Sequence, residues 1–165
     1  MSNIELLKTR DGVQSLTVLK THSGFKTEAD LVVGFVRCIE SGTTYWRGSQ
    51  VTREWVHPSG STDVLIRTKS RKLIAFEAKL SDWRRAFHQA YRNASFAHHV
   101  YVLLPCERVT RPLLYRNEFE LRGIGLCSLD EGRVRVHIAA APQVRLVRWV
   151  REGAHRFFDE QLRIS

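Results

Sequence analysis

Two apolar runs of strand length, separated by a segment with helical spacing, constrain the fold of this chain more than any other feature. Residues Leu73–Lys79 and His99–Leu104 are rich in aliphatic residues, and the second run ends at Pro105. A nearly continuous apolar run is typical of a strand covered on both faces. Because a helix connects the two strands, we expect them to lie parallel. The pattern predicts an α/β protein with a central mixed sheet flanked by helices.

Caps and turns divide the rest of the chain into further elements. Thr27 is a good N-cap residue for a first helix, Ser81-Asp82 for the crossover helix, and the polar segment 69–72 makes a hairpin turn. In residues 1–26 the pattern is weak, with a short strand or helix suggested over 15–20. The expected elements are a helix over 28–40, strands over 51–57, 62–68 and 73–79, a helix after Asp82, a strand over 99–104, a helix over 111–121, strands over 124–129 and 134–138, and an amphipathic helix from Val144.

Length and composition favour a single domain of residues 1–165. The chain is 43% hydrophobic and 10% aromatic, which is enough to bury a core, and it contains no internal repeat or low-complexity linker. Its longest apolar runs are far shorter than the roughly 20 residues that cross a bilayer. The start lacks the pattern of a secretory leader, so we expect a cytoplasmic protein without a membrane partner. Three widely separated cysteines argue against a disulfide framework or a structural zinc site.

The charge of the chain favours a polyanionic partner. There are 26 Lys and Arg residues against 17 Asp and Glu residues, which gives a formal net charge of +9. The simplest polyanion is nucleic acid, whereas the alternative is that the charge serves solubility alone. In residues 81–165 every basic residue is arginine, whose planar fork suits phosphate oxygens. The candidate nucleic-acid contacts on helical segments are Arg84, Arg85, Arg145, Arg148 and Arg156.

Asp63, Glu77 and Lys79 are the polar residues that stand out in the expected central strands. Side chains alternate along a strand, so Glu77 and Lys79 are expected on one face and Ala78 on the other. An antiparallel hairpin would bring Asp63, at the start of one strand, near Glu77, at the end of the next. Two carboxylates and a backbone carbonyl supply the hard oxygen ligands that Mg²⁺ prefers. The lysine ammonium can neutralise charge that develops on a phosphate or orient the attacking water.

These residues also resemble a known family. Gly60-x-x-Asp63, Glu77-x-Lys79 and the downstream helical Gln89 are similar to the motifs of the PD-(D/E)xK, or restriction-endonuclease-like, nuclease superfamily. The Gly-x-x-Asp turn and the glutamine resemble the branch that contains phage exonucleases, resolvases and repair nucleases. The similarity covers about residues 27–105 and leaves 106–165 as a C-terminal extension.

The resemblance implies a core in the order α-β-β-β-α-β and a nuclease that hydrolyses DNA with Mg²⁺ or Mn²⁺, acting in repair, recombination or defence. Thr62 stands where the nominal family motif has proline, a departure common in the superfamily. The implied metal ligands are Glu28, Asp63, Glu77 and the carbonyl of Ala78, and the implied catalytic residues are Asp63, Glu77, Lys79 and Gln89.

Each of these assignments has a plainer interpretation. Asp63 can be an ordinary turn residue, and Glu77 with Lys79 can form a solvated strand face. Glu28 can be a carboxylate favoured at a helix N-terminus, and Gln89 can be exposed. The function of the whole protein is open in the same way: it can be an RNA-directed nuclease, or a catalytically inactive nuclease-fold protein that binds nucleic acid or a protein partner. A homodimer or a larger complex is also left open.

Aromatic and polar residues outside this set are expected to be structural. Trp46 and Trp55 are more typical of core residues than of platforms for base stacking. Asn93 is expected to lie outside the apolar face of the crossover helix. His98-His99 would point to opposite faces of a strand, which makes them a poor pair of metal ligands, so they are expected to be structural or to lie beside a phosphate.

Overall fold

The computed structural model describes residues 24–144 and 146–164. The strand or helix suggested over 15–20 and the candidate nucleic-acid contact Arg145 lie outside these residues. The first elements are α1 (Glu28–Glu40), β1 (Gln50–His57), β2 (Gly60–Arg67), β3 (Leu73–Ala78), α2 (Trp83–Asn93) and β4 (His99–Pro105). The expected element order α-β-β-β-α-β is therefore confirmed for residues 28–105.

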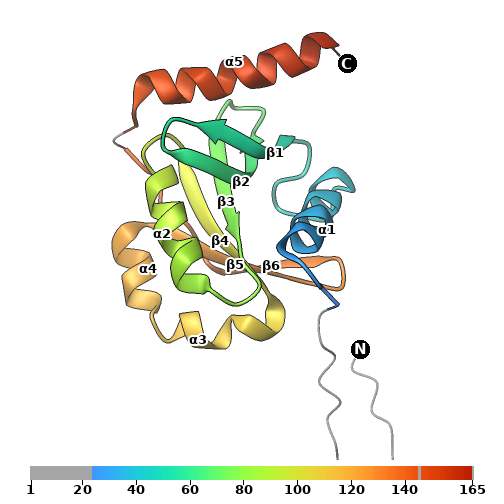
Figure 1. Ribbon diagram of the computed structural model, residues 1–165, viewed down its shortest axis with the longest axis vertical. Coiled ribbons are helices and arrows are strands. Elements are labelled where there is room, and N and C mark those ends of the chain that lie inside the picture. Colours follow the sequence, from blue (N-terminus) through green and yellow to red (C-terminus); the bar gives the residue numbers. More distant parts are fainter. Residues whose placement is uncertain (1–23, 145, 165) are drawn as a thin grey trace, which may run out of the picture.

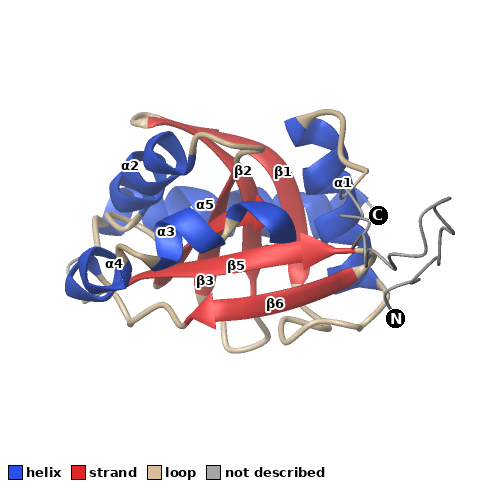
Figure 2. Cartoon of the chain, turned by 90° about the horizontal axis from the view of Figure 1, so that it is seen from below, coloured by secondary structure: helices blue, strands red, loops and turns tan. Residues whose placement is uncertain are grey.

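The strands form one mixed sheet in the order β1-β2-β3-β4-β5-β6, with β5 (Ile124–Asp130) and β6 (Arg133–Ile138) at one edge (Figure 2). β1 to β3 are antiparallel neighbours, β3, β4 and β5 run parallel, and β6 returns antiparallel to β5. The expected parallel pairing is confirmed, with Ile74 opposite His99 and Ala78 opposite Leu103. The carboxyl ends of the parallel strands β3, β4 and β5 therefore lie side by side.

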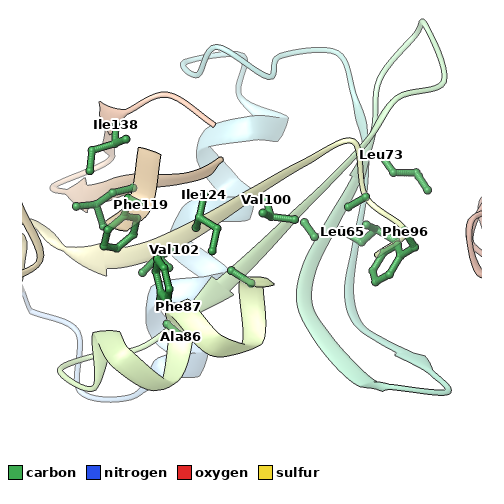
Figure 3. Packing of buried hydrophobic residues seen from close by; sticks show 14 of the residues in the cluster. Leu65, Leu73, Ala86, Phe87, Phe96, Val100, Val102, Phe119, Ile124 and Ile138 are labelled. Atoms are coloured by element: carbon green, nitrogen blue, oxygen red, sulfur yellow. The ribbon is translucent and has the colours of Figure 1, made fainter. Parts of the chain in front are cut away.

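Helices cover both faces of this sheet, and each face has its own core. Figure 1 shows α1 on one side and α2 with α4 (Arg116–Arg122) on the other. On the α1 side, Phe35 packs against Phe76 of β3 with 4.7 Å between ring centroids. On the α2 side, Phe87 packs against Phe119 of α4 at 4.8 Å, over Val102 of β4 (Figure 3). The central strands β3, β4 and β5 are thus covered on both faces, as the apolar runs of β3 and β4 predicted.

The prediction of a single helix over 111–121 is wrong. The chain instead forms a short 3₁₀ turn, η1 (Cys106–Arg108), followed by two short helices, α3 (Thr110–Leu113) and α4. The break falls at Leu114 and Tyr115. There the Tyr115 ring packs against Trp83 at the start of α2, with 5.2 Å between centroids. The Arg84 guanidinium lies 4.2 Å from the Trp83 ring and 4.4 Å from the Tyr115 ring. This tertiary contact holds the turn.

The closing helix, α5 (Arg148–Ile164), begins four residues later than the expected start at Val144. The preceding chain is instead bonded to the connection between α2 and β4, where the Val147 N–H donates to the Ser95 carbonyl at 2.6 Å. α5 then crosses the end of the sheet near the β1–β2 hairpin (Figure 1). Neither α5 nor any other helix in the described residues is long and apolar enough to span a membrane.

Candidate metal and catalytic site

The ends of β2 and β3 bring Asp63 and Glu77 together. Antiparallel pairing of the two strands reaches Val64 and Phe76, so Asp63 and Glu77 are the next residues on facing strands. At this point the Ala78 N–H donates to Asp63 Oδ2 at 2.8 Å, in place of a continued backbone ladder. The bond fixes the Asp63 carboxylate beside the carboxyl end of β3. As expected, the Asp63 and Glu77 carboxylates therefore lie near each other at this strand end.

Glu77 is a buried acid, and only one of its two carboxylate oxygens has a hydrogen-bond partner among the described residues. Its residue is 1% exposed, Oε1 accepts from Asn93 Nδ2 at 2.6 Å, and Oε2 has no partner among the described residues. Burial, and then the nearby Asp63 carboxylate, raise the pKa of Glu77 to about 8. A buried carboxylate is costly unless a countercharge offsets its desolvation. The plainer interpretation, in which Glu77 lies on a solvated strand face, is therefore wrong.

The donor set fits a hard divalent cation. Asp63, Glu77 and the Ala78 carbonyl offer oxygen ligands. The Glu77 oxygen that has no hydrogen-bond partner could bind the cation. Within residues 24–144 and 146–164, no three His, Cys, Asp or Glu side chains are grouped to hold a metal by themselves. Further ligands would therefore come from backbone, solvent or substrate, which is the usual situation for Mg²⁺.

Lys79 follows the last residue of β3 and is 7% exposed. Its Nζ donates to Glu28 Oε2 at 2.9 Å and to the Ala78 carbonyl at 2.9 Å, and lies 4.0 Å from Asp63 Oδ2. The ammonium therefore sits among the implied metal ligands. A buried ammonium held this way is positioned to interact with a bound phosphate.

Glu28 reaches this cluster from the first turn of α1. The helix begins there because Thr27 accepts from the Asp30 N–H at 3.1 Å while Asp30 accepts from the Thr27 N–H at 2.9 Å, a reciprocal cap. The cap presents Glu28 to Lys79, and the Glu28 side chain is 49% exposed. Glu28 thus contacts the site through Lys79, in addition to its favourable place at a helix N-terminus.

Two amide side chains lie on α2, Gln89, which sequence reasoning identified, and Asn93, and of these Asn93 contacts the site. Gln89 is half-buried, and its Oε1 is buried without a partner among the described residues. Asn93, one turn further along the same helix face, is 2% exposed and holds Glu77. The expectation that Asn93 lies outside the buried face is wrong, because its amide donates to one oxygen of the buried Glu77 carboxylate. The spacing of four residues from Gln89 was the signal that could have identified it.

Glu54 is a second residue that sequence reasoning missed. It lies on β1 between the pairs Arg53–Val64 and Trp55–Thr62, so its position faces Asp63 across the ladder. Its φ of 52° is in the left-handed region, which is unfavourable for a residue with a side chain. Glu54, Glu28 and Asp63 all line a hollow of about 600 Å³ between α1 and β1. The candidate site therefore opens to solvent through an acidic hollow.

Four of the arginines expected to contact nucleic acid belong to the described residues, and they lie on two different helices. Arg84 Nη1 on α2 is 2.6 Å from a Glu118 carboxylate oxygen, which binds it to α4. Arg85 is exposed. On α5, Arg148 is 83% exposed and pairs with a glutamate one turn later at 2.7 Å, and Arg156 is exposed. Arg85, Arg148 and Arg156 are thus accessible, whereas Arg84 is engaged within the protein.

The fold and site define an α/β protein with a six-stranded mixed sheet and an acidic cluster around the buried Glu77 at the end of a central strand. No protein-family model matches the chain, and no curated protein matches it. Among solved structures, it is similar to the SPO1766 protein of unknown function from Silicibacter pomeroyi. The TM-score is 0.59 at 16% sequence identity, over 84% of this chain and 88% of the other. At this identity the similarity shows a shared fold.

Proposed function

We propose that this protein is a metal-dependent nuclease with a restriction-endonuclease-like core, which hydrolyses phosphodiester bonds in DNA in the cytoplasm with Mg²⁺ or Mn²⁺. The observation that carries the proposal is the convergence of Asp63, Glu77 and Lys79 at the carboxyl end of β3. Glu77 and Lys79 are buried beside the partly exposed Asp63 carboxylate, and burying charged groups has a stability cost that a structural role does not require. A net charge of +9 supports a nucleic-acid substrate. DNA repair, recombination or defence is the proposed setting.

Each residue has a task in this proposal. Asp63, Glu77 and the Ala78 carbonyl would hold the cation, which supplies Lewis-acid chemistry by polarising phosphate oxygens and lowering the pKa of water. Lys79 places a positive charge beside the scissile phosphate, where negative charge increases in the transition state. Glu28 orients the Lys79 ammonium, and Gln89 offers an unpartnered amide oxygen near the buried face of α2.

The test is cleavage of labelled linear, nicked, branched and single-stranded DNA, with an RNA strand for comparison, in Mg²⁺, Mn²⁺ or excess EDTA. We expect metal-dependent cleavage of at least one DNA substrate, and its loss in Asp63→Ala. Cleavage that continues in EDTA would contradict a metal-dependent mechanism. Equal rates for wild type and Asp63→Ala would show that the cluster is not the active site.

One observation favours a second candidate, an inactive nuclease-fold protein that binds nucleic acid or a protein partner. The Lys79 ammonium already bonds to Glu28 and to the Ala78 carbonyl, two of the implied metal ligands. This pairing competes with a cation for the same oxygens. Titration with Mn²⁺, followed by the paramagnetic broadening of nearby NMR signals, separates the two candidates. Broadening at β3 supports the nuclease, whereas DNA binding without broadening supports the inactive protein.

A further inference from the structure

A second cavity, of about 780 Å³, lies at the opposite end of β3 from the acidic cluster. Ile74 and His99, near the beginnings of β3 and β4, are part of its lining, whereas Asp63 and Glu77 are not. Its rim comes from two connections, residues 45–49 before β1 and residues 68–72 between β2 and β3. Both connections adjoin the same end of the sheet, because Gln50 pairs with Arg67 and Arg67 pairs with Leu73.

Aromatic rings form part of the wall of this cavity. Trp46 and Tyr101 line it, lie 5.3 Å apart between centroids, and are anchored in the core under α1. Tyr45 also lines it, but this residue is 90% exposed and meets Trp46 edge-on at 6.3 Å. A tyrosine ring left in water beside two fixed rings is available to stack on a planar ligand.

Cations surround the same cavity without carboxylates. Its lining contains Arg47, Lys69 and Lys72 and no Asp or Glu, and these three cations form no ion pair within the described residues. The Lys69 side chain lies over Gly48, where an added Cβ would be 3.7 Å from Nζ. Gly48 has a φ of 71°, so glycine suits this turn and leaves room for the lysine.

His99 adds a polar group to the same lining. Its Nδ1 is buried and has no partner among the described residues. Burial, and then Lys72, lower the pKa of His99, which favours the neutral imidazole that can both donate and accept a hydrogen bond. A neutral ring of this kind suits the edge of a heterocyclic base.

We propose that this cavity binds a nucleotide, with its base against the aromatic wall and its phosphate on Lys69 and Lys72. The volume is in the range of ordinary small-molecule sites, roughly 300–1,000 Å³. The aromatic wall matches a planar base, and lysines are common phosphate ligands. The acidic hollow beside Asp63 would repel the same phosphate. The proposal therefore concerns a separate site, and it stands whether or not the acidic cluster cleaves DNA.

The test is calorimetric titration of the whole chain in EDTA with adenosine 5′-monophosphate, adenosine and inorganic phosphate. We expect saturable binding of the nucleotide and at least tenfold weaker binding of each fragment. Tyr45→Ala should weaken nucleotide binding by about fivefold or more, the lower end of the effect of ring–base stacking. Tyr91→Ala, which removes a half-exposed ring from α2, is the matched control and should change nothing.

Charge is tested in the same way. Lys69→Glu with Lys72→Glu should abolish measurable binding, whereas Arg108→Glu with Arg111→Glu changes the net charge equally outside the cavity and should preserve it. An eight-residue oligothymidylate distinguishes the two sources of the nucleotide. Tighter binding of this strand than of the mononucleotide, with the same variant sensitivity, assigns the site to nucleic acid, and the reverse assigns it to a free nucleotide.

Three results would overturn the proposal: no saturable binding of either ligand, equal affinity for phosphate and nucleotide, or equal losses in the cavity and control variants. Asp63→Ala separates this site from the proposed nuclease function. That variant should lose cleavage and keep nucleotide binding, so the failure of one proposal leaves the other to be judged by its own measurement.

Discussion

Glu77 and Asp63 occupy facing positions on neighbouring strands, yet their surroundings differ. The Asp63 side chain is 29% exposed and accepts a backbone N–H, whereas the Glu77 residue is 1% exposed and is held by a neutral amide. In the absence of a cation the proton therefore belongs on Glu77, whose pKa is raised to about 8. Binding of a divalent cation would favour the ionised form and displace that proton.

This difference predicts how stability depends on pH. Because the folded state binds the Glu77 proton more tightly than the unfolded chain, protonation of Glu77 stabilises the fold fully below its ordinary pKa of 4.5, and this stabilisation is lost as pH rises through about 8. The two pKa values correspond to at most about 5 kcal/mol. In EDTA, the unfolding free energy of the wild type should decrease from about pH 5 to about pH 9, and this decrease should be smaller in Glu77→Gln. The measurement is urea denaturation at each pH.

The control for this experiment is Glu160→Gln, which changes an exposed carboxylate on α5. It should follow the wild-type pH profile. Addition of Mg²⁺ at pH 8.5 should stabilise the wild type and leave Glu77→Gln almost unchanged. A wild-type profile in Glu77→Gln would mean that this carboxyl titrates normally in the folded protein.

Lys79 gives a second prediction at the same scale. Lys79→Met keeps most of the side-chain stem but removes the ammonium, so we expect cleavage to fall by at least about 100-fold if the charge stabilises the transition state. Lys26→Met, at an exposed position before α1, is the matched control. Both variants are compared at equal folded fraction, determined by circular dichroism. Unchanged cleavage in Lys79→Met would remove lysine from the proposed mechanism.

At the scale of elements, α5 is held to the sheet by a buried cation. Arg67, on β2, is 4% exposed, and its guanidinium donates to Asp159 at 2.6 Å and to the His155 carbonyl at 3.1 Å on α5. It also donates to Gln50 on β1 at 2.6 Å and lies 5.1 Å from the Phe158 ring centroid. A cation buried this deeply depends on its countercharge more than an exposed cation does.

We therefore expect Asp159→Ala to destabilise the protein clearly more than Glu152→Ala. The first change leaves the Arg67 charge buried without its carboxylate, whereas the second removes an exposed pair with Arg148 on the same helix. The measurement is the midpoint of thermal unfolding, together with hydrogen exchange along α5. Equal shifts for the two variants would show that the Arg67 contact does not anchor the helix.

Local signals predicted the elements that depend on local structure. The helix over 28–40 has the predicted bounds because Thr27 caps it and its apolar residues repeat at helical spacing. The expected helix over 111–121 failed because Tyr115 packs against Trp83, a residue more than 30 positions away. Propensity within a window contains no information about such a contact. Trp46 and Trp55 are buried, as expected for core residues.

Local rules likewise predicted one part of the candidate site and missed another. Alternation along a strand and hairpin pairing were enough to place Asp63 beside Glu77. Asn93 and Glu54 could not be placed from those rules. The first depends on which face α2 presents to β3, and the second on an unusual backbone conformation within β1. The similarity to known nuclease motifs identified residue types, but it gave no information about these supporting residues.

At the scale of the whole molecule, the two cavities described above carry opposite charge. The hollow beside Asp63 is lined by Glu28, Glu40 and Glu54 as well, and the cavity at the other end of β3 is lined by cations alone among charged residues. A net charge of +9 is thus not spread evenly over the surface. A phosphate chain would be attracted to the basic regions and would approach the acidic hollow only where a cation is bound.

α5 would connect this charge pattern to the proposed DNA binding, because Gln161 of α5 lines the acidic hollow while Arg148 and Arg156 are exposed on the same helix. If these arginines and Arg85 contact phosphates, each contact releases a counterion, and the slope of log affinity against log salt concentration should fall by about 0.9 for each arginine removed. We therefore expect the triple alanine variant at these three positions to show a clearly flatter slope, measured by fluorescence anisotropy with one DNA duplex in Ca²⁺. A second triple variant, with alanine at positions 108, 111 and 133, loses the same three charges elsewhere and controls for net charge. Equal slopes in the two variants would assign the salt dependence to overall charge and would remove α5 from the proposed DNA contact.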